Sequence, residues 1–468
     1  MTSTARSPDG NLVFPVIYAY IIPDLAKLDP GRAAEYVAWG KELQAQTPHA
    51  DGLRHFYNSD YTASHSGGSM ISLKMYSKRT ENNEVTNMEG LMSWHTASGA
   101  LLSYRTGAEY SAIFPLWDWA RIPGTTTRRA RDETYDKVKH SGRTSFVGGL
   151  TQNYSSSSNP LSGLGVSCMD FASNDFGGTG ESKSAVTAKK SWFWLGDKAG
   201  AGTGSVLAMY EDIQVNGTLA AGQQLGTSLE QSNLEGDVVW GAGGGAAPVT
   251  LKKHGRYMLA EAKWVLHNEV MYSLFSSSLG GGAASALNLT FGNVTGSWRR
   301  ITTAGSNVSI SSALFSLDVK HDNSGSSDLN YAITTGVTSA AAADEAYVSL
   351  AAIAKGAVGH KAGSGASSLS FGVTTLATVW AAGSVVADAP CVVASTKSAG
   401  RLHFAVANPL NQGATIKINS KHKLRPNGQL AAAGEVTAAV TCAADGATVT
   451  LPAGASAGST ISGSCQLA

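Results

Sequence analysis

A short polar segment between Ser77 and Leu101 carries the residue types that acid–base chemistry on a polar substrate requires. Carboxylates move or orient protons, amides bind hydroxyl and carboxylate groups, and an indole ring offers a flat surface for stacking. The candidate catalytic residue is Glu84. The candidate binding residues are Arg79, Asn82, Asn87, Glu89 and Trp94.

Two carboxylates in one segment also raise the possibility of a paired-carboxylate site. Glu84 and Glu89 are five residues apart, and in a turn or strand they need not face each other. We therefore rank this pairing below a role for Glu84 alone. No nucleophile elbow, phosphate-binding loop or dinucleotide fingerprint is present in a strand–turn–helix context, so we expect no cofactor.

The composition favours an all-β protein. The chain has 468 residues, of which only 15% are charged, and it contains 53 glycines. Lys and Arg (35) nearly balance Asp and Glu (34), so there is no electrostatic argument for a nucleic-acid or anionic membrane partner. Low charge and many small residues are typical of extracellular β proteins.

The cysteines leave two interpretations open. There are four, Cys168, Cys391, Cys442 and Cys465, without metal-ligand spacing. They are either buried thiols or, in a secreted chain, partners in disulfides, with Cys442–Cys465 as the pair we expect. Five N-x-S/T sites permit N-glycosylation, at Asn153, Asn216, Asn288, Asn293 and Asn307.

The N-terminal region is the part of the chain with a convincing helical pattern. Residues 12–46 place apolar side chains at helical spacing, and Pro30 opens a second segment. The apolar run from Leu12 to Ile22 is interrupted by Pro15, is too short to span a membrane and makes a poor signal peptide.

Beyond residue 52 the pattern changes to short strands separated by turn residues. Runs such as SMISLKMYS, SVLAMYEDI and SALFSLDV are divided by Gly, Asn, Asp and Ser clusters, which predicts a sandwich-type fold. A composition change near 360–380 indicates a smaller β domain at the end of the chain. We find no fixed-period repeat.

Several blocks of sequence resemble polysaccharide lyase family 8, the hyaluronate, chondroitin AC and xanthan lyases. SKRTENNEVTNMEGLMSWHTASGALLSY resembles the family's R-x-x-N-x-E-x-x-N-x-E-N-x-x-G-W-Y-T-G-D-G pattern. EYSAIFPLWDWARIPGTTT is similar to its Y-x-x-x-F/W-P-x-x-D-x-x-R-x-P-G-T-T pattern, and AKKSWFWLGD, LGTSLEQS, AKWVLHNEVMYSLF and GSWRRI follow in the family's order. Departures from the pattern are His95, Ser98 and Gly90, where the family has Tyr, Asp and an amide.

The resemblance implies a fold and a division into domains. It implies a mainly β chain with an antiparallel supersandwich of the galactose-mutarotase type and a small C-terminal β-sandwich. The expected boundaries are 1–50 for a helical remnant of the family's toroid, 51–370 for the supersandwich and 371–468 for the C-terminal domain.

The resemblance also implies a reaction. The family cleaves uronic-acid polysaccharides by β-elimination, in which a proton leaves C5 and the bond from C4 to the bridging oxygen breaks. Family members use toroid residues for carboxylate binding and proton transfer, and a Glu and an Asn of the β half, spaced like Glu84 and Asn87, support those groups. We find no counterpart of the toroid residues before residue 50.

Other residues have interpretations that we weigh against their structural roles. His254, His267 and His321 favour sheet histidines over zinc ligands. KHDNSGSSD (320–328) favours a solvated turn over a calcium loop. Most tryptophans favour core positions over sugar platforms, because their rings carry a large area to bury; those considered are Trp94, Trp117, Trp119, Trp192, Trp194, Trp264 and Trp298.

We therefore expect a carbon–oxygen lyase acting on an acidic polysaccharide or oligosaccharide, with no nucleic-acid partner, no membrane span and, by resemblance, an extracellular location. The alternative is a non-catalytic carbohydrate-binding or structural β-sandwich module. A further reading is that Met1 is not the start of the ancestral protein.

Overall fold

The fold was examined in a computed structural model of the chain. The structure describes residues 14–45, 51–83, 89–129, 146–152, 159–173, 186–196, 204–219, 222–243, 245–278, 286–354, 357–358, 365–420, 423–426 and 440–468. The described part is mainly β, as expected, with five antiparallel sheets and few helices.

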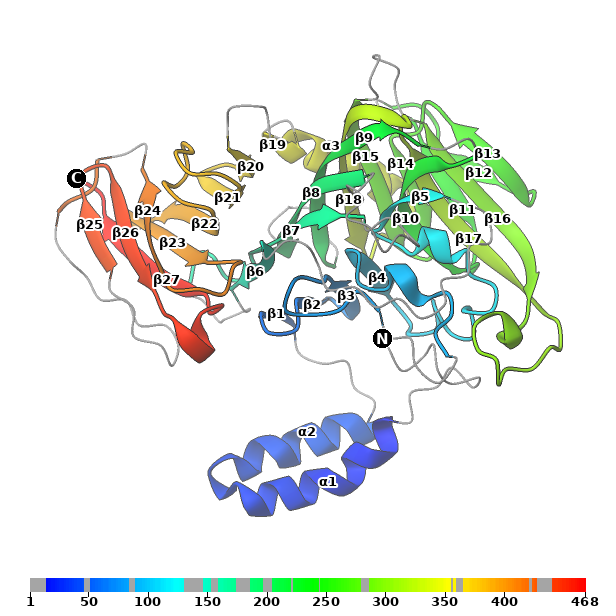
Figure 1. The fold of residues 1–468 in the computed structure, drawn as a ribbon, viewed down its shortest axis with the longest axis horizontal. Helices are drawn as coiled ribbons and strands as arrows, with labels where there is room; N and C mark the ends of the chain where they lie inside the picture. The colour runs from blue at the N-terminus through cyan, green and yellow to red at the C-terminus, as the bar shows by residue number, and fades with distance from the viewer. Residues whose placement is uncertain are drawn as a thin grey trace.

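Two helices form a hairpin at the N-terminus. α1 (Phe14–Leu28) and α2 (Ala33–Ala45) are joined by the 3₁₀ turn η2 (Pro30–Arg32), in which proline takes the first position because it has no amide hydrogen to leave unpaired. The helical pattern and the break at Pro30 are thereby confirmed. Figure 1 shows the hairpin lying apart from the strands.

The first sheet is a four-stranded meander in the order β1-β2-β3-β4. Its strands are β1 (Gly52–Phe56), β2 (Tyr61–Ser66), β3 (Ser69–Lys74) and β4 (Ala100–Tyr104). The segment of chemical interest runs between β3 and β4 and includes the short η3 (Ser93–His95). A further 3₁₀ turn, η4 (Trp119–Arg121), follows β4.

Two larger sheets stack face to face. The nine-stranded sheet has the order β12-β11-β14-β15-β18-β9-β8-β7-β6, and the five-stranded sheet has the order β13-β16-β17-β10-β5. The strands of the nine-stranded sheet are β6 (Val147–Thr151), β7 (Gly165–Ala172), β8 (Val186–Gly196), β9 (Val206–Thr218), β11 (Val238–Gly241), β12 (Val249–Leu251), β14 (Trp264–His267), β15 (Val270–Ser278) and β18 (Ser324–Thr335). Those of the five-stranded sheet are β5 (Thr126–Arg129), β10 (Gln224–Asn233), β13 (Gly255–Leu259), β16 (Leu287–Gly296) and β17 (Ile310–Lys320). The 3₁₀ turn η5 (Trp298–Arg300) joins β16 to β17.

The main core lies between these two sheets. Strand residues alternate between the two faces, so Leu287, Leu289 and Phe291 of β16 point inward and meet Trp192 and Trp194 of β8 in one buried cluster. A second cluster covers the other face of the nine-stranded sheet. β8 is therefore buried on both faces, which explains its long apolar run.

A third helix was not predicted. α3 (Ala340–Ala354) packs on the outer face of the nine-stranded sheet through Ala343, Ala346 and Leu350. The prediction that helical structure is confined to residues 12–46 is therefore wrong. Its sequence, AAAADEAYVSLAAIA, is rich in the best helix former, and its buried residues recur at helical spacing.

The C-terminal part is a second sandwich. A six-stranded sheet, β19-β20-β21-β22-β23-β27, faces a three-stranded sheet, β24-β26-β25. Its strands are β19 (Ala357–Val358), β20 (Ala366–Phe371), β21 (Thr374–Val379), β22 (Cys391–Ser398), β23 (Arg401–Ala407), β24 (Ala414–Asn419), β25 (Val440–Ala443), β26 (Gly446–Leu451) and β27 (Ile461–Gln466), with η6 (Gly454–Ser456) before the last strand.

The change of sheet comes earlier in the chain than the expected boundary at residue 370. That boundary falls inside β20, which pairs with β21 and so belongs to the C-terminal sandwich. Figure 1 shows this sandwich at one end of the molecule and the two large sheets at the other.

The cysteines combine both interpretations. Cys442 and Cys465 form a disulfide between β25 and β27, as expected, whereas Cys168 and Cys391 are buried thiols.

Candidate active site

The two residues of greatest interest lie outside the described residues. Glu84 and Asn87 belong to residues 84–88, for which no placement is given. Their predicted roles therefore stay predictions. The structure does describe the chain on both sides of this stretch and what holds it there.

The chain leading to this stretch is fixed by one buried carboxylate. Asp60, which is 0% exposed, accepts hydrogen bonds from Ser77 Oγ (2.6 Å), Thr80 Oγ1 (2.7 Å) and Arg79 Nη2 (2.6 Å). Charge-assisted bonds of this kind are about twice as strong as neutral ones. The turn that follows β3 is thus held rigidly.

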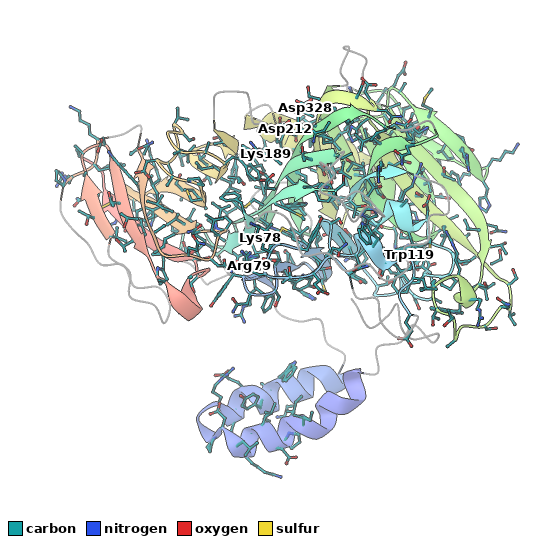
Figure 2. All side chains as sticks on the ribbon, in the orientation of Figure 1. Lys78, Arg79, Trp119, Lys189, Asp212 and Asp328 are labelled. Atoms are coloured by element: carbon teal, nitrogen blue, oxygen red, sulfur yellow. A yellow bond between two sulfur atoms is a disulfide. The ribbon has the colours of Figure 1, made fainter. Side chains whose placement is uncertain are left out.

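Arg79 uses its guanidinium to join parts of the protein. Besides Asp60, its Nη2 donates to the carbonyl of Val147 (2.6 Å) and its Nη1 to that of Pro409 (3.3 Å). Its side chain is 22% exposed. Figure 2 labels Arg79 beside Lys78, close to the middle of the molecule. This arrangement makes Arg79 a positioning residue, and its role in substrate binding stays a prediction.

Two hydrogen bonds connect the chain before residues 84–88 with the chain after them. Asn82 Nδ2 donates to the carbonyl of Trp94 (3.0 Å), and Thr96 Oγ1 donates to the carbonyl of Asn82 (3.3 Å). Asn82 and Trp94 are both buried, whereas Glu89 is half-buried. The indole of Trp94 is 4% exposed, and its contact with substrate stays a prediction.

Asn83 is a polar residue that the sequence analysis did not single out. Its side chain is 6% exposed, and neither its amide nitrogen nor its amide oxygen has a hydrogen-bond partner among the residues that the structure describes. A buried amide without partners is costly, and such groups in native proteins call for an explanation. The only sequence signal was its place immediately before Glu84.

The histidine in this segment is kept neutral. His95 is 6% exposed, and burial, with smaller effects from Arg128 and Lys190, lowers its pKa to about 3. Its Nδ1 lies 3.4 Å from Ser98 Oγ. An imidazole with this pKa does not gain a proton near neutral pH, so His95 is not suited to proton transfer there.

A buried polar network lies between the stacked sheets beneath β5. Lys190, which is 0% exposed, donates to Thr126 Oγ1 (2.7 Å) and to the carbonyl of Gly124 (3.1 Å), and its Nζ lies 3.4 Å from Glu211 Oε1. Thr126 Oγ1 in turn donates to Glu211 Oε2 (2.5 Å). Lys190 lies in the AKKSWFWLGD block, but the spacing of that block does not reveal its buried partner.

A second network surrounds a single buried carboxyl. Tyr272 and Tyr110 donate to Glu230 at 2.6 and 2.8 Å. Burial raises the pKa of Glu230 to about 7, against the opposing effect of the two tyrosine hydrogen bonds. The sequence analysis did not identify Glu230, because its partners come from distant strands.

The remaining candidates occupy structural positions. Six of the seven tryptophans considered are buried, and Trp298 is half-buried. His267 accepts from the Glu235 amide and stacks on Phe315, and His321 Nε2 lies 2.9 Å from Thr227 Oγ1. His254 lies against Phe291.

Metal and membrane sites were also considered within the described residues. No group of three His, Cys, Asp or Glu side chains in this part of the chain is placed to hold a metal ion. Residues 320–328 cover the end of β17, the turn at 321–323 and the start of β18. No described helix has the length and apolar character needed to cross a bilayer.

Comparison with known proteins assigns the chain to a family. The sequence profile of polysaccharide lyase family 8, super-sandwich domain, matches residues 51–346. The chain therefore belongs to polysaccharide lyase family 8.

The relatives include two characterised enzymes. Chondroitinase-AC of Pedobacter heparinus is 27% identical over 270 residues, which cover 57% of this chain and 32% of that enzyme. Hyaluronate lyase HylB of Enterococcus faecalis is 30% identical over 151 residues, covering 31% of this chain and 14% of that enzyme. The chain thus matches about a third or less of the length of either enzyme.

Solved structures share the fold over most of the chain. A chondroitinase AC lyase studied with bound oligosaccharides matches with a TM-score of 0.67 and 20% identity, covering 92% of this chain and 57% of that one. A Paenibacillus xanthan lyase matches with a TM-score of 0.68 and 17% identity, covering 92% and 39%. The Streptomyces coelicolor chondroitin AC lyase, solved with chondroitin sulphate, matches with a TM-score of 0.67 and 20% identity, covering 92% and 53%.

Proposed function

We propose that this chain supplies the β side of a lyase site that cleaves a uronic-acid-containing polysaccharide by β-elimination. The observation that carries the proposal is the family match over residues 51–346, which includes the segment with Glu84 and Asn87. The fixing of the chain on either side of residues 84–88, by Asp60 and by the Asn82–Trp94 bond, supports it, because catalytic groups must be held in place to act.

The chemistry sets the role of each group. Removal of the C5 proton places negative charge on the sugar carboxylate, so the site must neutralise that charge and protonate the leaving oxygen at C4. Glu84 and Asn87 would orient the groups that do this. The half-buried Glu89 would contact sugar hydroxyls from the other end of the stretch.

The proposal is tested by eliminative cleavage. Hyaluronan, chondroitin, xanthan and alginate are incubated with the chain, and the ultraviolet absorbance of the new unsaturated uronate is followed. Glu84→Ala should lower kcat by about two orders of magnitude or more, because an orienting group acts on the transition state. Glu81→Ala, an exposed carboxylate three residues earlier, is the control and should leave the rate unchanged. Equal rates for both variants and the unaltered chain would refute the role of Glu84.

A non-catalytic glycan-binding module is the second candidate. His95 favours it, because it stands where the family pattern has Tyr and this imidazole is buried and uncharged near neutral pH. A binding module would retain polysaccharide saturably and release no unsaturated product over long incubation. In that case Glu84→Ala would change the affinity little.

A further inference from the structure

The outer face of the five-stranded sheet carries short polar side chains on β16 and β17. Asn288 and Thr290 of β16 point away from the core that Leu289 and Phe291 enter, and Ser316 of β17 does the same. Apolar side chains lie beside these positions: Met258 of β13 is the register partner of Asn288, and Val294 of β16 and Leu314 of β17 border the same space. The face is therefore an open floor that mixes amide and hydroxyl groups with apolar side chains.

A groove of about 930 Å³ lies over this floor. It is bordered by β13 on one side and by the chain around η4 on the other. Its size is within the range of ligand-binding clefts. Among the described residues of the predicted lyase site, none of Arg79, Asn82, Glu89 and Trp94 lines it. Figure 2 shows Trp119 of η4 well to one side of Arg79.

One wall of the groove is held by an ion pair. Arg121 Nη1 contacts Asp318 Oδ1 at 2.7 Å, and both side chains are mostly buried. Gln231 fixes the same wall, since its Nε2 donates to the carbonyls of Asp118 and Arg121, both at 3.1 Å. The wall is thus formed before any ligand is bound.

Two further cations face the groove without an acidic partner. Arg256 of β13 and Lys320 of β17 are exposed, and neither makes an ion pair or side-chain hydrogen bond within the part of the chain that the structure describes. Burial lowers the pKa of Arg121; its partner Asp318 opposes this, whereas the like charge of Arg256 lowers it further. The groove therefore has cationic groups in excess of its carboxylates.

We propose that this groove is an accessory binding site for an acidic glycan segment, distinct from the segment that carries Glu84. Arg256 and Lys320 bind carboxylate or sulfate groups of the glycan. Asn288, Thr290 and Ser316 bind its hydroxyls, and the Arg121–Asp318 pair keeps the wall in place. The inference rests on the proposed function, because it takes its ligand class from it.

The chemistry of the groove fits this ligand better than other anions. A basic stripe for nucleic acid would need many cations, whereas this chain has a formal net charge of only +1. A small inorganic anion would use the cations and leave the hydroxyl and amide floor unused. An extended chain with many hydroxyls and occasional negative charges uses both.

The test measures binding without turnover. Calorimetric titration with size-defined hyaluronan and chondroitin oligosaccharides is performed on the full chain carrying Glu84→Ala. Adding Arg256→Ala and Lys320→Ala together should weaken the affinity about tenfold or more and reduce its salt dependence. Lys423→Ala, which removes an exposed cation from the C-terminal sandwich, is the control and should leave the affinity unchanged.

The outcomes separate this inference from the proposed function. Unchanged affinity in the groove variant, or equal weakening by Lys423→Ala, would overturn the accessory site while leaving cleavage by the chain with Glu84 unaffected. Failure of cleavage together with a groove-dependent affinity would overturn the lyase proposal alone. Unfolding temperatures equal to that of the parent chain confirm that the exposed substitutions leave the fold intact.

Two of the five N-x-S/T asparagines, Asn288 and Asn293, line the groove. Asn288 lies on its floor. A glycan attached there would fill the space, so the accessory site requires an unmodified Asn288. Peptide mass spectrometry of the chain from a glycosylating host checks this, and full occupancy of Asn288 would overturn the proposal.

Discussion

At the scale of single residues, Glu230 is the group whose surroundings have the clearest consequence. It is 2% exposed and receives two tyrosine hydroxyls, and burial raises its pKa from the usual 4.5 to about 7. The folded protein thus keeps a proton that the unfolded chain has already released. Folding is favoured by protonation of this carboxyl, and the contribution is complete only below the unfolded pKa.

Glu230 should therefore lower stability as the pH rises. Between about pH 5 and pH 8, the unaltered chain should lose up to about 3 kcal/mol of unfolding free energy relative to Glu230→Gln, whose amide does not titrate. Urea unfolding of both proteins across this range measures the difference. Parallel curves would show that Glu230 is ionised to the same extent in the folded and unfolded states.

From the sequence, a contiguous motif could be recognised, whereas buried polar residues with partners distant in the chain could not. The motif around Glu84 could be recognised because its residues are contiguous. Asp60 could not, because it lies in the turn before β2 and meets Arg79 and Thr80, which follow β3, only once β2 and β3 pair. Glu230 and Lys190 were missed for the same reason: their partners are brought to them only by strand pairing and by the stacking of the two sheets.

At the scale of elements, Gly124 shows how closely the segment between β4 and β5 packs against the start of β4. Its φ of +80° lies in the left-handed region, and a Cβ there would meet the carbonyl oxygen of Gly99 at 2.4 Å and the side chain of Leu101 at 2.6 Å. The Gly124 amide donates to the carbonyl of Ser228 (2.7 Å). Only glycine satisfies both the backbone angle and this close approach.

Alanine substitutions at two glycines distinguish the cost of a positive φ from the cost of steric overlap at Gly124. Gly107→Ala is the matched control, since Gly107 has a φ of +89° but nothing within 4 Å of an added Cβ. It should cost about 1–2 kcal/mol of unfolding free energy for the backbone angle. Gly124→Ala should cost clearly more, because Gly99 and Leu101 must move. Chemical unfolding compares the two variants, and equal losses would show that the backbone absorbs the methyl group.

Helices were predicted correctly where several local sequence signals marked the same segment. The helical hairpin was confirmed because apolar spacing and Pro30 both mark it. α3 was missed because an alanine-rich run in a chain full of small residues looks like a loop until its helical spacing of Ala343, Ala346 and Leu350 is considered. The expected boundary at residue 370 lies within β20, because composition changes gradually, whereas sheet pairing changes at a strand.

At the scale of the whole molecule, Arg79 connects three sheets. Its guanidinium bonds to Asp60 beside the first sheet, to Val147 at the start of β6 in the nine-stranded sheet, and to Pro409 after β23 in the C-terminal sandwich. A contact between Asn411 Nδ2 and the carbonyl of Tyr57 (3.0 Å) joins the C-terminal sandwich to the first sheet nearby. The segment with Glu84 begins at this junction.

Arg79→Ala should therefore affect stability and activity together. It leaves Asp60, at 0% exposure, without its cation, and breaking such a pair from one side costs about 3–5 kcal/mol. Lys78→Ala removes the neighbouring exposed cation that Figure 2 labels and is the matched control, with little expected effect. Calorimetric unfolding of the two variants, followed by cleavage or binding assays below the unfolding temperature, tests this.

If Arg79→Ala unfolds like the unaltered chain but loses affinity for polysaccharide, Arg79 contacts the substrate directly. If it is destabilised and the lost function returns with the double substitution Arg79→Met and Asp60→Asn, its role is to hold the junction, since that pair leaves no buried charge unpaired.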